Sequence, residues 1–186
     1  EDSQRHKSSE EDPGASADLS EIPRWILDKG TAPAHGADWG GSGPLRIKHM
    51  GLLDADGKPS KTIKSDSPFG LFADIESEEF GEFQCSCTFV IYDEQGEVVT
   101  RLVEPQRSYE FNEKMCRVIA WVQNNPIGKG AYTVSGGLFR DYRLEAPAEA
   151  HRYHILSRGL QFRVRSERRD ICRVYLNADW QSDTNQ

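Results

Sequence analysis

The stretch Arg117–Phe139, RVIAWVQNNPIGKGAYTVSGGLF, decides the fold of this chain. Two β-rich runs, 118–122 and 132–138, flank a turn that holds Pro126 and two glycines. A tyrosine just after a glycine turn, at the start of a late strand, is the arrangement of a tyrosine corner, which pins a loop of a β-sandwich. The stretch therefore predicts an antiparallel β-sandwich with Tyr132 in its core.

The rest of the chain repeats this pattern of short β-rich runs separated by turn residues. We expect strands at 45–53, 62–64, 69–75, 83–92, 97–103, 115–123, 131–139, 152–156, 160–165 and 171–176. In this interpretation residues 31–44 form a loop around Trp39. The sequence has no long amphipathic helical pattern, which argues against a doubly wound α/β fold. It predicts an all-β sandwich or jelly roll of about 8–10 strands.

The acidity of the chain is concentrated at its N-terminus. Residues 1–21 carry seven acidic and two basic side chains, a net charge of −5, while the whole chain of 186 residues carries −7. The remaining −2 gives no general electrostatic argument for nucleic-acid binding. We expect residues 1–36 to be a disordered acidic tail and linker, residues 37–180 to be the sandwich, and residues 181–186 to be a frayed C-terminus.

The sequence lacks the common motifs of catalysis. It has no GxxxxGK[ST] loop for ATP, no GxSxG nucleophile elbow and no HExxH zinc motif. His151 and His154 would point to opposite faces of a strand, which is poor for a shared metal. The carboxylates between Glu76 and Glu82 form an acidic loop without an apolar pocket to raise a pKa. We therefore expect no catalytic residue, no metal and no cofactor.

The four cysteines, Cys85, Cys87, Cys116 and Cys172, are expected to be reduced. Cys85 and Cys87 lie two residues apart on one face of a strand, where a disulfide between them is geometrically awkward. Buried free thiols are typical of cytosolic proteins. No apolar run approaches the length of a membrane span, and the first residues are acidic rather than signal-like.

Several short motifs occur along the chain in an order that carries information about its family. They are Asp38-Trp39-Gly40, Gly51-Leu52-Leu53-Asp54, Asp56-Gly57, the run Val90–Val99, the run Asn124–Val134, and Leu160–Val164. In this order they resemble the C-terminal carbohydrate-binding domain of Wzt, the ATP-binding subunit of bacterial ABC transporters that export O-antigen polysaccharide. The resemblance covers about residues 37–180.

The resemblance implies an immunoglobulin-like or jelly-roll sandwich that dimerises by exchange of a C-terminal strand, here Ile171–Trp180. It implies recognition of the modified non-reducing end of a finished glycan in the cytoplasm, at the inner face of the inner membrane. An ATPase domain would precede Glu1, and the partners would be the terminal sugars or cap, a second copy of the chain, and the ATPase and membrane subunits.

Strand alternation, rather than a matched motif, gives the candidate glycan-binding residues. The polar residues opposite the core are Gln84, Ser86 and Thr88, then Thr133 and Ser135, then Gln161 and Arg163. Short hydroxyl and amide side chains leave a groove and supply directional hydrogen bonds, although the same residues also suit a plain solvated face. Trp121 is either a core residue or, if exposed, a platform on which a sugar ring stacks.

The basic residues of the C-terminal part also allow two interpretations. The set is Arg158, Arg163, Arg165, Arg168, Arg169 and Arg173. It either keeps an exposed sheet face soluble or forms a groove for an anionic ligand such as an acidic sugar or a phosphate cap. Two other function classes stay open: a protein-interaction sandwich with exposed edges, and a sugar-modifying enzyme that would need a metal or an acid/base pair.

Overall fold

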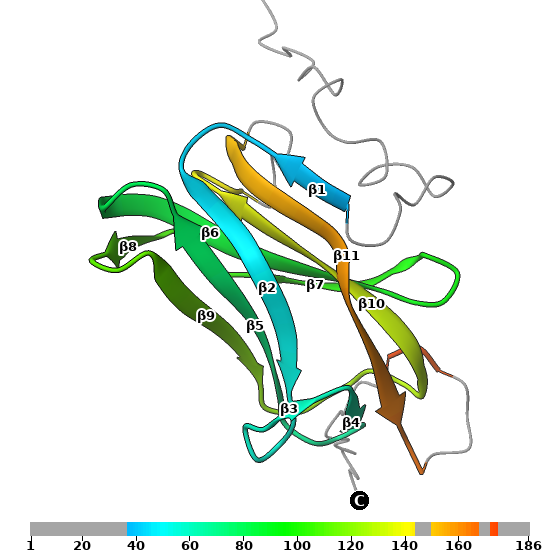
Figure 1. Cartoon of the computed structure of the whole chain (residues 1–186). Helices are drawn as coiled ribbons and strands as arrows, with labels where there is room; N and C mark the ends of the chain where they lie inside the picture. The colour runs from blue at the N-terminus through cyan, green and yellow to red at the C-terminus, as the bar shows by residue number, and fades with distance from the viewer. Residues whose placement is uncertain (1–36, 144–149, 168–171, 175–186) are drawn as a thin grey trace, which may run out of the picture.

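The computed structural model describes residues 37–143, 150–167 and 172–174, which form a sandwich of two β-sheets (Figure 1). These residues contain eleven strands and no helix. The strands are β1 (Ala37–Gly40), β2 (Leu45–Leu53), β3 (Pro59–Ser60), β4 (Thr62–Lys64), β5 (Phe69–Ser77), β6 (Gly81–Tyr92), β7 (Val98–Val103), β8 (Arg107–Phe111), β9 (Met115–Val122), β10 (Gly130–Phe139) and β11 (Arg152–Arg165).

The larger sheet has the order β1-β11-β10-β6-β7, with β4 beside β11 and β8 beside β6. The smaller sheet has the order β3-β2-β5-β9. Every strand pair is antiparallel except β4 with β11. The predicted all-β sandwich is therefore confirmed.

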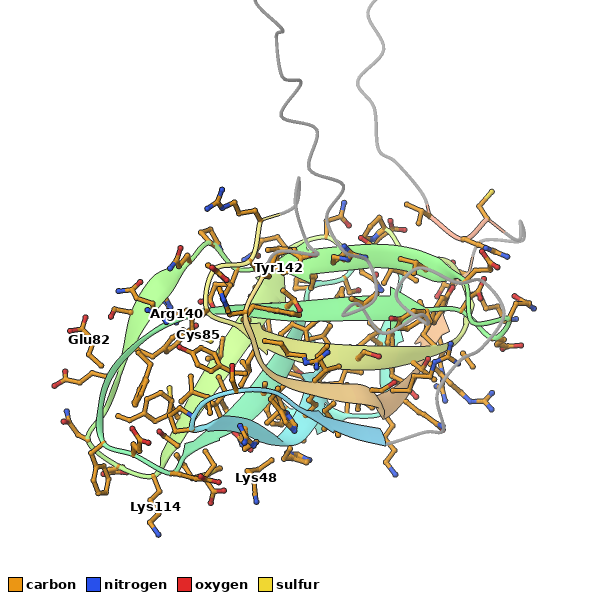
Figure 2. All side chains as sticks on the ribbon, turned by 90° about the horizontal axis from the view of Figure 1, so that it is seen from above. Lys48, Glu82, Cys85, Lys114, Arg140 and Tyr142 are labelled. Atoms are coloured by element: carbon orange, nitrogen blue, oxygen red, sulfur yellow. The ribbon has the colours of Figure 1, made fainter. Side chains whose placement is uncertain are left out.

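The core lies between the two sheets and follows the predicted alternation. On β6, the buried inward residues are Cys85, Cys87, Phe89 and Ile91, which alternate with Gln84, Ser86 and Thr88 on the opposite face, as strand alternation predicts. The facing strand β5 contributes Leu71 and Ile75, both fully buried. Burial of such an apolar side chain stabilises a fold by about 1.5–3 kcal/mol, so this layer is the main source of stability. Figure 2 shows charged side chains such as Lys48, Glu82 and Lys114 on the outside.

The predicted tyrosine corner is present. The hydroxyl of Tyr132 donates a hydrogen bond of 2.8 Å to the carbonyl of Gly128, and the side chain is only 5% exposed. Its ring stacks on Phe162, with 5.5 Å between the centroids. Strands β9 and β10 belong to opposite sheets, so the corner closes the segment that crosses from one sheet to the other.

Asn125 also stabilises the segment that crosses from β9 to β10, through hydrogen bonds of its side-chain amide. Its side-chain nitrogen donates to the carbonyl of Lys64 at 2.9 Å, and its side-chain oxygen accepts the backbone N–H of Ile127 at 3.0 Å. Asn125 is fully buried, so these bonds satisfy a polar group that would otherwise be costly to bury. The crossing is thus tied to β4 as well as to β10.

His154 links the two sheets directly. It lies on β11, is fully buried, and its Nδ1 accepts the backbone N–H of Ile47 on β2 at 3.1 Å. The register of β2 against β5 shifts between Ile47 and His49, beside this bond. Because Nδ1 accepts a hydrogen bond, it carries no proton in this arrangement.

Three short or irregular strands differ from the predicted pattern. Strand β1 replaces part of the loop predicted at 31–44, because its backbone pairs with the edge of β11. Strands β3 and β8 were not predicted. β3 has only two residues, and its order comes from pairing with the end of β2. β8 pairs with β6, and its alternating aromatic residues, Tyr109 and Phe111, are buried in the core.

The predicted strands 152–156 and 160–165 form one strand, β11, that continues through an irregularity at Arg158. The backbone of Arg158 has φ +47°, in the left-handed region. The predicted tail at 1–36, the frayed end at 181–186 and most of the segment 171–180 lie outside the described residues. Of that last segment, Val174 forms an isolated bridge with Ile127.

The four cysteines are free, as expected. Cys85 and Cys87 are buried, Cys116 is half-buried and Cys172 is exposed. Burial raises the pKa of the Cys85 thiol to about 12, so this group stays protonated at neutral pH.

We predict that Tyr132→Phe lowers the free energy of unfolding by about 1–3 kcal/mol, because the variant leaves the Gly128 carbonyl without its buried partner. Urea denaturation followed by circular dichroism measures this. Tyr153→Phe is the matched control, since the Tyr153 hydroxyl has no hydrogen bond among the described residues, and it should change stability by less than about 0.5 kcal/mol. Equal effects of the two substitutions would show that the corner does not stabilise the fold.

Candidate functional site

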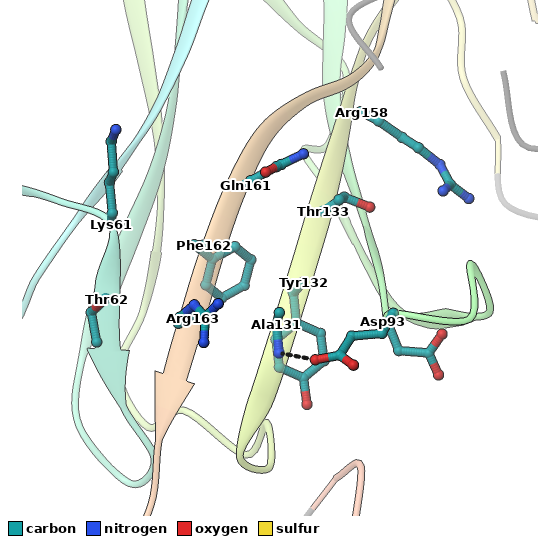
Figure 3. Close-up of a pocket in the computed structure, with 11 residues that line it drawn as sticks. Lys61, Thr62, Asp93, Ala131, Tyr132, Thr133, Arg158, Gln161, Phe162 and Arg163 are labelled. Carbon is teal, nitrogen blue, oxygen red and sulfur yellow. Dashed lines mark hydrogen bonds between the residues drawn. The ribbon is translucent and has the colours of Figure 1, made fainter. Parts of the chain in front are cut away.

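A trough of about 440 Å³ lies on the outer side of the larger sheet, where β10 and β11 run side by side (Figure 3). Lys61 and Thr62 border it on the β4 side, and the turn between β6 and β7 borders it on the opposite side. Its size lies within the range of about 300–1,000 Å³ that is common for ligand sites.

The floor of the trough is built from cross-strand neighbours. Thr133 on β10 is in register with Gln161 on β11, and Ala131 is in register with Arg163. Gln161 and Arg163 are exposed, whereas Thr133 is half-buried. The hydroxyl oxygen of Thr133 is buried and has no hydrogen-bond partner among the described residues. The floor therefore offers a hydroxyl and an amide in one cross-strand row and a guanidinium in the next row on the same face.

Arg158 borders the trough at the irregularity of β11. Its backbone N–H donates to the hydroxyl of Ser135 at 2.9 Å, which fixes the local chain path. The guanidinium carbon lies 4.9 Å from the centre of the Tyr92 ring, within the range of a cation–π contact. The Nε of Arg158 is buried without a hydrogen-bond partner in the described part of the chain.

The turn between β6 and β7 places two carboxylates at the trough, and both are engaged. Asp93 accepts the backbone N–H groups of Gln95 and Glu97 at 3.0 and 2.9 Å, and it forms an ion pair with Arg173 at 3.0 Å. Glu94 accepts the N–H of Ala131 at 3.1 Å. These bonds hold the turn against β10 and give both carboxylates a structural role.

The structure brings only some of the predicted glycan-binding residues together. Thr133, Gln161 and Arg163 line the trough, and Ser135 lies next to it beneath Arg158. Gln84 is exposed at the far end of β6, where its amide donates to the Ser108 hydroxyl at 3.2 Å.

Ser86 and Thr88 lie on the predicted side of β6, but they are buried rather than solvated, at 0% and 4% exposure. The ring of Phe139 lies over Gly137, directly beside the Thr88 hydroxyl, and Tyr142 packs on Phe139 at 4.9 Å. Aromatic side chains from the end of β10 therefore cover this half of the polar face, and the plain solvated face expected there is wrong.

Trp121 lies on β9 of the smaller sheet, so it is separated from the trough by the sandwich core. It is 38% exposed, which makes the core interpretation wrong. Val118, Ala120 and Val122 take the inward positions of this edge strand. The indole lies over Gly70, where an added Cβ would stand 2.7 Å from the ring.

Two cationic residues of the trough, Arg158 and Lys61, were not among the predicted binding residues. Arg158 belonged to the basic set but does not follow strand alternation, because the irregularity in β11 changes which way it points. Lys61 precedes a three-residue strand, and its place beside β11 depends on the parallel pairing of β4 with β11. Neither placement has a signal in the sequence.

The described residues include no group of three or more His, Cys, Asp or Glu side chains that could hold a metal ion. Within the same residues, no helix has the length and hydrophobicity that crossing a membrane requires.

Comparison with known proteins gives one clear match. A family model described as the Wzt C-terminal domain matches residues 37–174. A crystal structure of the C-terminal domain of wzt is similar, with a TM-score of 0.64 and 12% sequence identity, and the alignment covers 86% of this chain and 95% of that chain. At this identity the likeness shows the shared fold. A search of curated proteins gives no match.

Two other solved structures are similar over part of the sandwich. A Pseudomonas fluorescens alkylpurine DNA glycosylase, AlkC, has a TM-score of 0.41 and 11% identity, over 67% of this chain and 31% of that chain. A β-glucuronidase from glycoside hydrolase family 2 has a TM-score of 0.35 and 15% identity, over 52% and 11%. Scores below 0.5 carry no argument about function.

The outer face of the smaller sheet supplies a prediction about pH. Arg117 donates to Asp74 at 2.6 and 2.9 Å, and these hydrogen bonds lower the pKa of Asp74 below its ordinary value of 3.8. A lowered folded-state pKa gives stability that is present above the unfolded pKa and is lost as the pH falls through the folded pKa.

We expect Asp74→Asn to lower the free energy of unfolding by up to about 1 kcal/mol at pH 7, because the pair lies at the surface. The difference from the unmodified protein should vanish as the pH falls well below 4. Asp56→Asn, in an exposed turn without an ion pair among the described residues, is the matched control for the loss of a surface carboxylate. Urea titrations at several pH values measure both, and a gap that persists in acid would contradict the ion-pair account.

Proposed function

The chain belongs to the Wzt C-terminal domain family, and on this premise we propose that its trough recognises the modified non-reducing end of an O-antigen polysaccharide during export. The family supports a carbohydrate-binding role in O-antigen export by ABC transporters in general. The observation that carries the finer proposal is the trough on β10 and β11, lined by Thr133, Gln161 and Arg163.

The trough suits the end of a sugar chain. It is open to solvent and presents a hydroxyl, an amide and guanidinium groups, which can form hydrogen bonds with the ring hydroxyls of a sugar. A glycan has many hydroxyl groups in fixed directions, so a rigid sheet that presents donors and acceptors in register gives selectivity.

The two carboxylates of the trough favour a binding module over an enzyme. Asp93 is held by turn N–H groups and Arg173, and Glu94 is held by the backbone of β10. A glycosidase uses a pair of carboxyl groups that flank the scissile bond, one of them as a proton donor. We therefore propose a module that holds a sugar end and leaves the hydrolysis of ATP to another part of the transporter.

We also propose that the module works on the cytoplasmic side of the inner membrane, beside the ATPase and membrane subunits of the transporter. The family assignment supports this setting. Residues 1–36 would then connect the sandwich to the ATPase domain.

Two copies of the chain are proposed to exchange the segment Ile171–Trp180. Strands β7 and β9 are edges of their sheets, and the apolar residues on their inward sides are only half-buried: Val99, Leu102, Cys116, Ala120 and Val122. In the proposed segment every second residue is apolar or sulfur-bearing: Cys172, Val174, Leu176, Ala178 and Trp180. A strand with one apolar face, added to an open edge, would cover such residues.

Calorimetry with capped and uncapped O-polysaccharide from the source organism tests the function. We expect the capped form to bind at least about tenfold more tightly, and Gln161→Ala to reduce its affinity by about tenfold through loss of a hydrogen bond in the trough. Gln84→Ala is the matched control, because Gln84 lies on the same side of the sheet but outside the trough.

Equal binding of capped and uncapped chains would contradict recognition of the modified end. Trp121→Ala in the same experiment reports whether the opposite sheet touches the glycan. A protein that binds no glycan but captures a protein partner would support the alternative, an interaction sandwich.

Light scattering tests the strand exchange. We predict a dimer for the intact chain and a monomer for Leu176→Asp, since a carboxylate on the apolar side of the segment would be costly to bury. Asn177→Asp changes the opposite side of the segment and should leave the dimer intact. A monomeric intact chain would contradict this proposal.

A further inference from the structure

We infer that the trough selects a glycan end that carries an oxyanion, a carboxylate or a phosphate, for which Arg158, Arg163 and Lys61 supply positive charge. This inference rests on the proposed function and names the chemistry of the group that the trough recognises. Three observations on the described residues carry it: the uncompensated charge of the trough, the unusual backbone of Arg158, and the way its guanidinium is held.

Three cations line the trough, one beside β4 and two from different parts of β11. Lys61 comes from the residue before β4, Arg158 from the irregularity of β11, and Arg163 from the straight part of β11 (Figure 3). None of the three forms an ion pair with another described residue. Of the two carboxylates of the trough, Asp93 pairs with Arg173 and Glu94 accepts the N–H of Ala131, so one unpaired carboxylate stands against three cations.

Three arginines outside the trough have carboxylate partners. Arg117 pairs with Asp74, Arg107 with Glu104 at 2.9 Å, and Arg173 with Asp93. Lys61, Arg158 and Arg163 lack such a partner among the described residues, and all three line the trough. A neutral sugar needs hydrogen bonds but gives no reason to gather cations that repel one another.

Arg158 occupies a backbone conformation that favours glycine. Its φ of +47° places it in the left-handed region, which is uncommon for a side chain as large as arginine. Residues held in such conformations cluster at sites of binding and catalysis, where the surrounding structure maintains them. Here the hydrogen bond from the Arg158 N–H to Ser135 maintains it.

The side chain of Arg158 is also held in place. Its guanidinium lies over Tyr92, and a Cβ at Gly96 would stand 2.8 Å from its Nη2. Gly96 itself has φ +82°, so the turn is shaped to leave this space. A guanidinium fixed before binding loses little freedom when it forms the two parallel hydrogen bonds that carboxylates and phosphates accept.

The test is a titration of the ¹⁵N-labelled full chain by two-dimensional NMR with glucose, glucuronic acid, glucose 6-phosphate and inorganic phosphate. We expect at least one acidic sugar to shift the amides of Thr133 and Gln161 and to bind at least about tenfold more tightly than glucose. The preference should weaken at high salt, as expected for a partly exposed charge contact. The relative affinities of the two acidic sugars show whether a carboxylate or a phosphate is preferred.

Arg158→Gln and Arg163→Gln should each reduce the affinity for the acidic sugar toward that for glucose. Arg165→Gln is the matched control, because Arg165 lies on the same side of β11 but outside the trough. Arg158→Gly separates folding from binding: glycine adopts a positive φ freely, so this variant should melt no lower than Arg158→Gln yet lose the preference for the acidic sugar.

Equal binding of glucose and both acidic sugars would overturn the inference and leave the glycan-binding function standing. Inorganic phosphate that binds as tightly as glucose 6-phosphate would also overturn it, since the trough would then be an ion site. If no acidic sugar shifts Thr133 and Gln161, the inference fails, and calorimetry with capped polysaccharide decides separately whether the proposed function fails with it.

Discussion

The hydrogen bond from the Tyr132 hydroxyl to the Gly128 carbonyl is the constraint on which the rest of the structure depends. It closes the segment that leaves β9 in one sheet and enters β10 in the other. The same tyrosine stacks on Phe162 of β11, so one side chain sets both where β10 begins and how β11 lies beside it. Because Thr133 and Gln161 are the next row of that strand pair, the corner also positions the floor of the trough.

The irregularity in β11 couples the fold to the proposed function. A regular strand would alternate strictly between core and solvent, and the side chains of a flat sheet alone would form a shallow surface. The irregularity turns Arg158 toward the β6–β7 turn, where Tyr92 and Gly96 receive its guanidinium. The trough therefore has one border made by Arg158 and another by Lys61 and Thr62 beside β11, neither of which strand alternation alone would place.

The two ends of the larger sheet show how one polar face can serve two purposes. Near the start of β10, the face is open and Thr133 borders the trough. Near its end, Phe139 and Tyr142 fold over the face and bury Ser86 and Thr88. The hydroxyls at that end therefore contribute to the interior of the protein, and the proposed binding surface lies on the part of the sheet next to the tyrosine corner.

The sequence by itself determined the class of fold, the main strands, the inward residues of β6 and the tyrosine corner. These features depend on local alternation, turn residues and one Gly-to-Tyr spacing, all of which are visible within a short window. It also singled out Thr133, Gln161 and Arg163, because side chains alternate between the two faces of a regular strand. The resemblance to the Wzt C-terminal domain came from the order of such short motifs.

Only the tertiary structure decided which of these residues meet. Strand alternation says which side a residue faces, but not what covers that side, so it could not separate the open Thr133 from the buried Thr88. It could not place Trp121 on the opposite sheet, because sheet membership depends on long-range pairing. Lys61 and Arg158 reach the trough through a parallel strand contact and an irregular backbone, and the energy of both arises from neighbours distant in the chain.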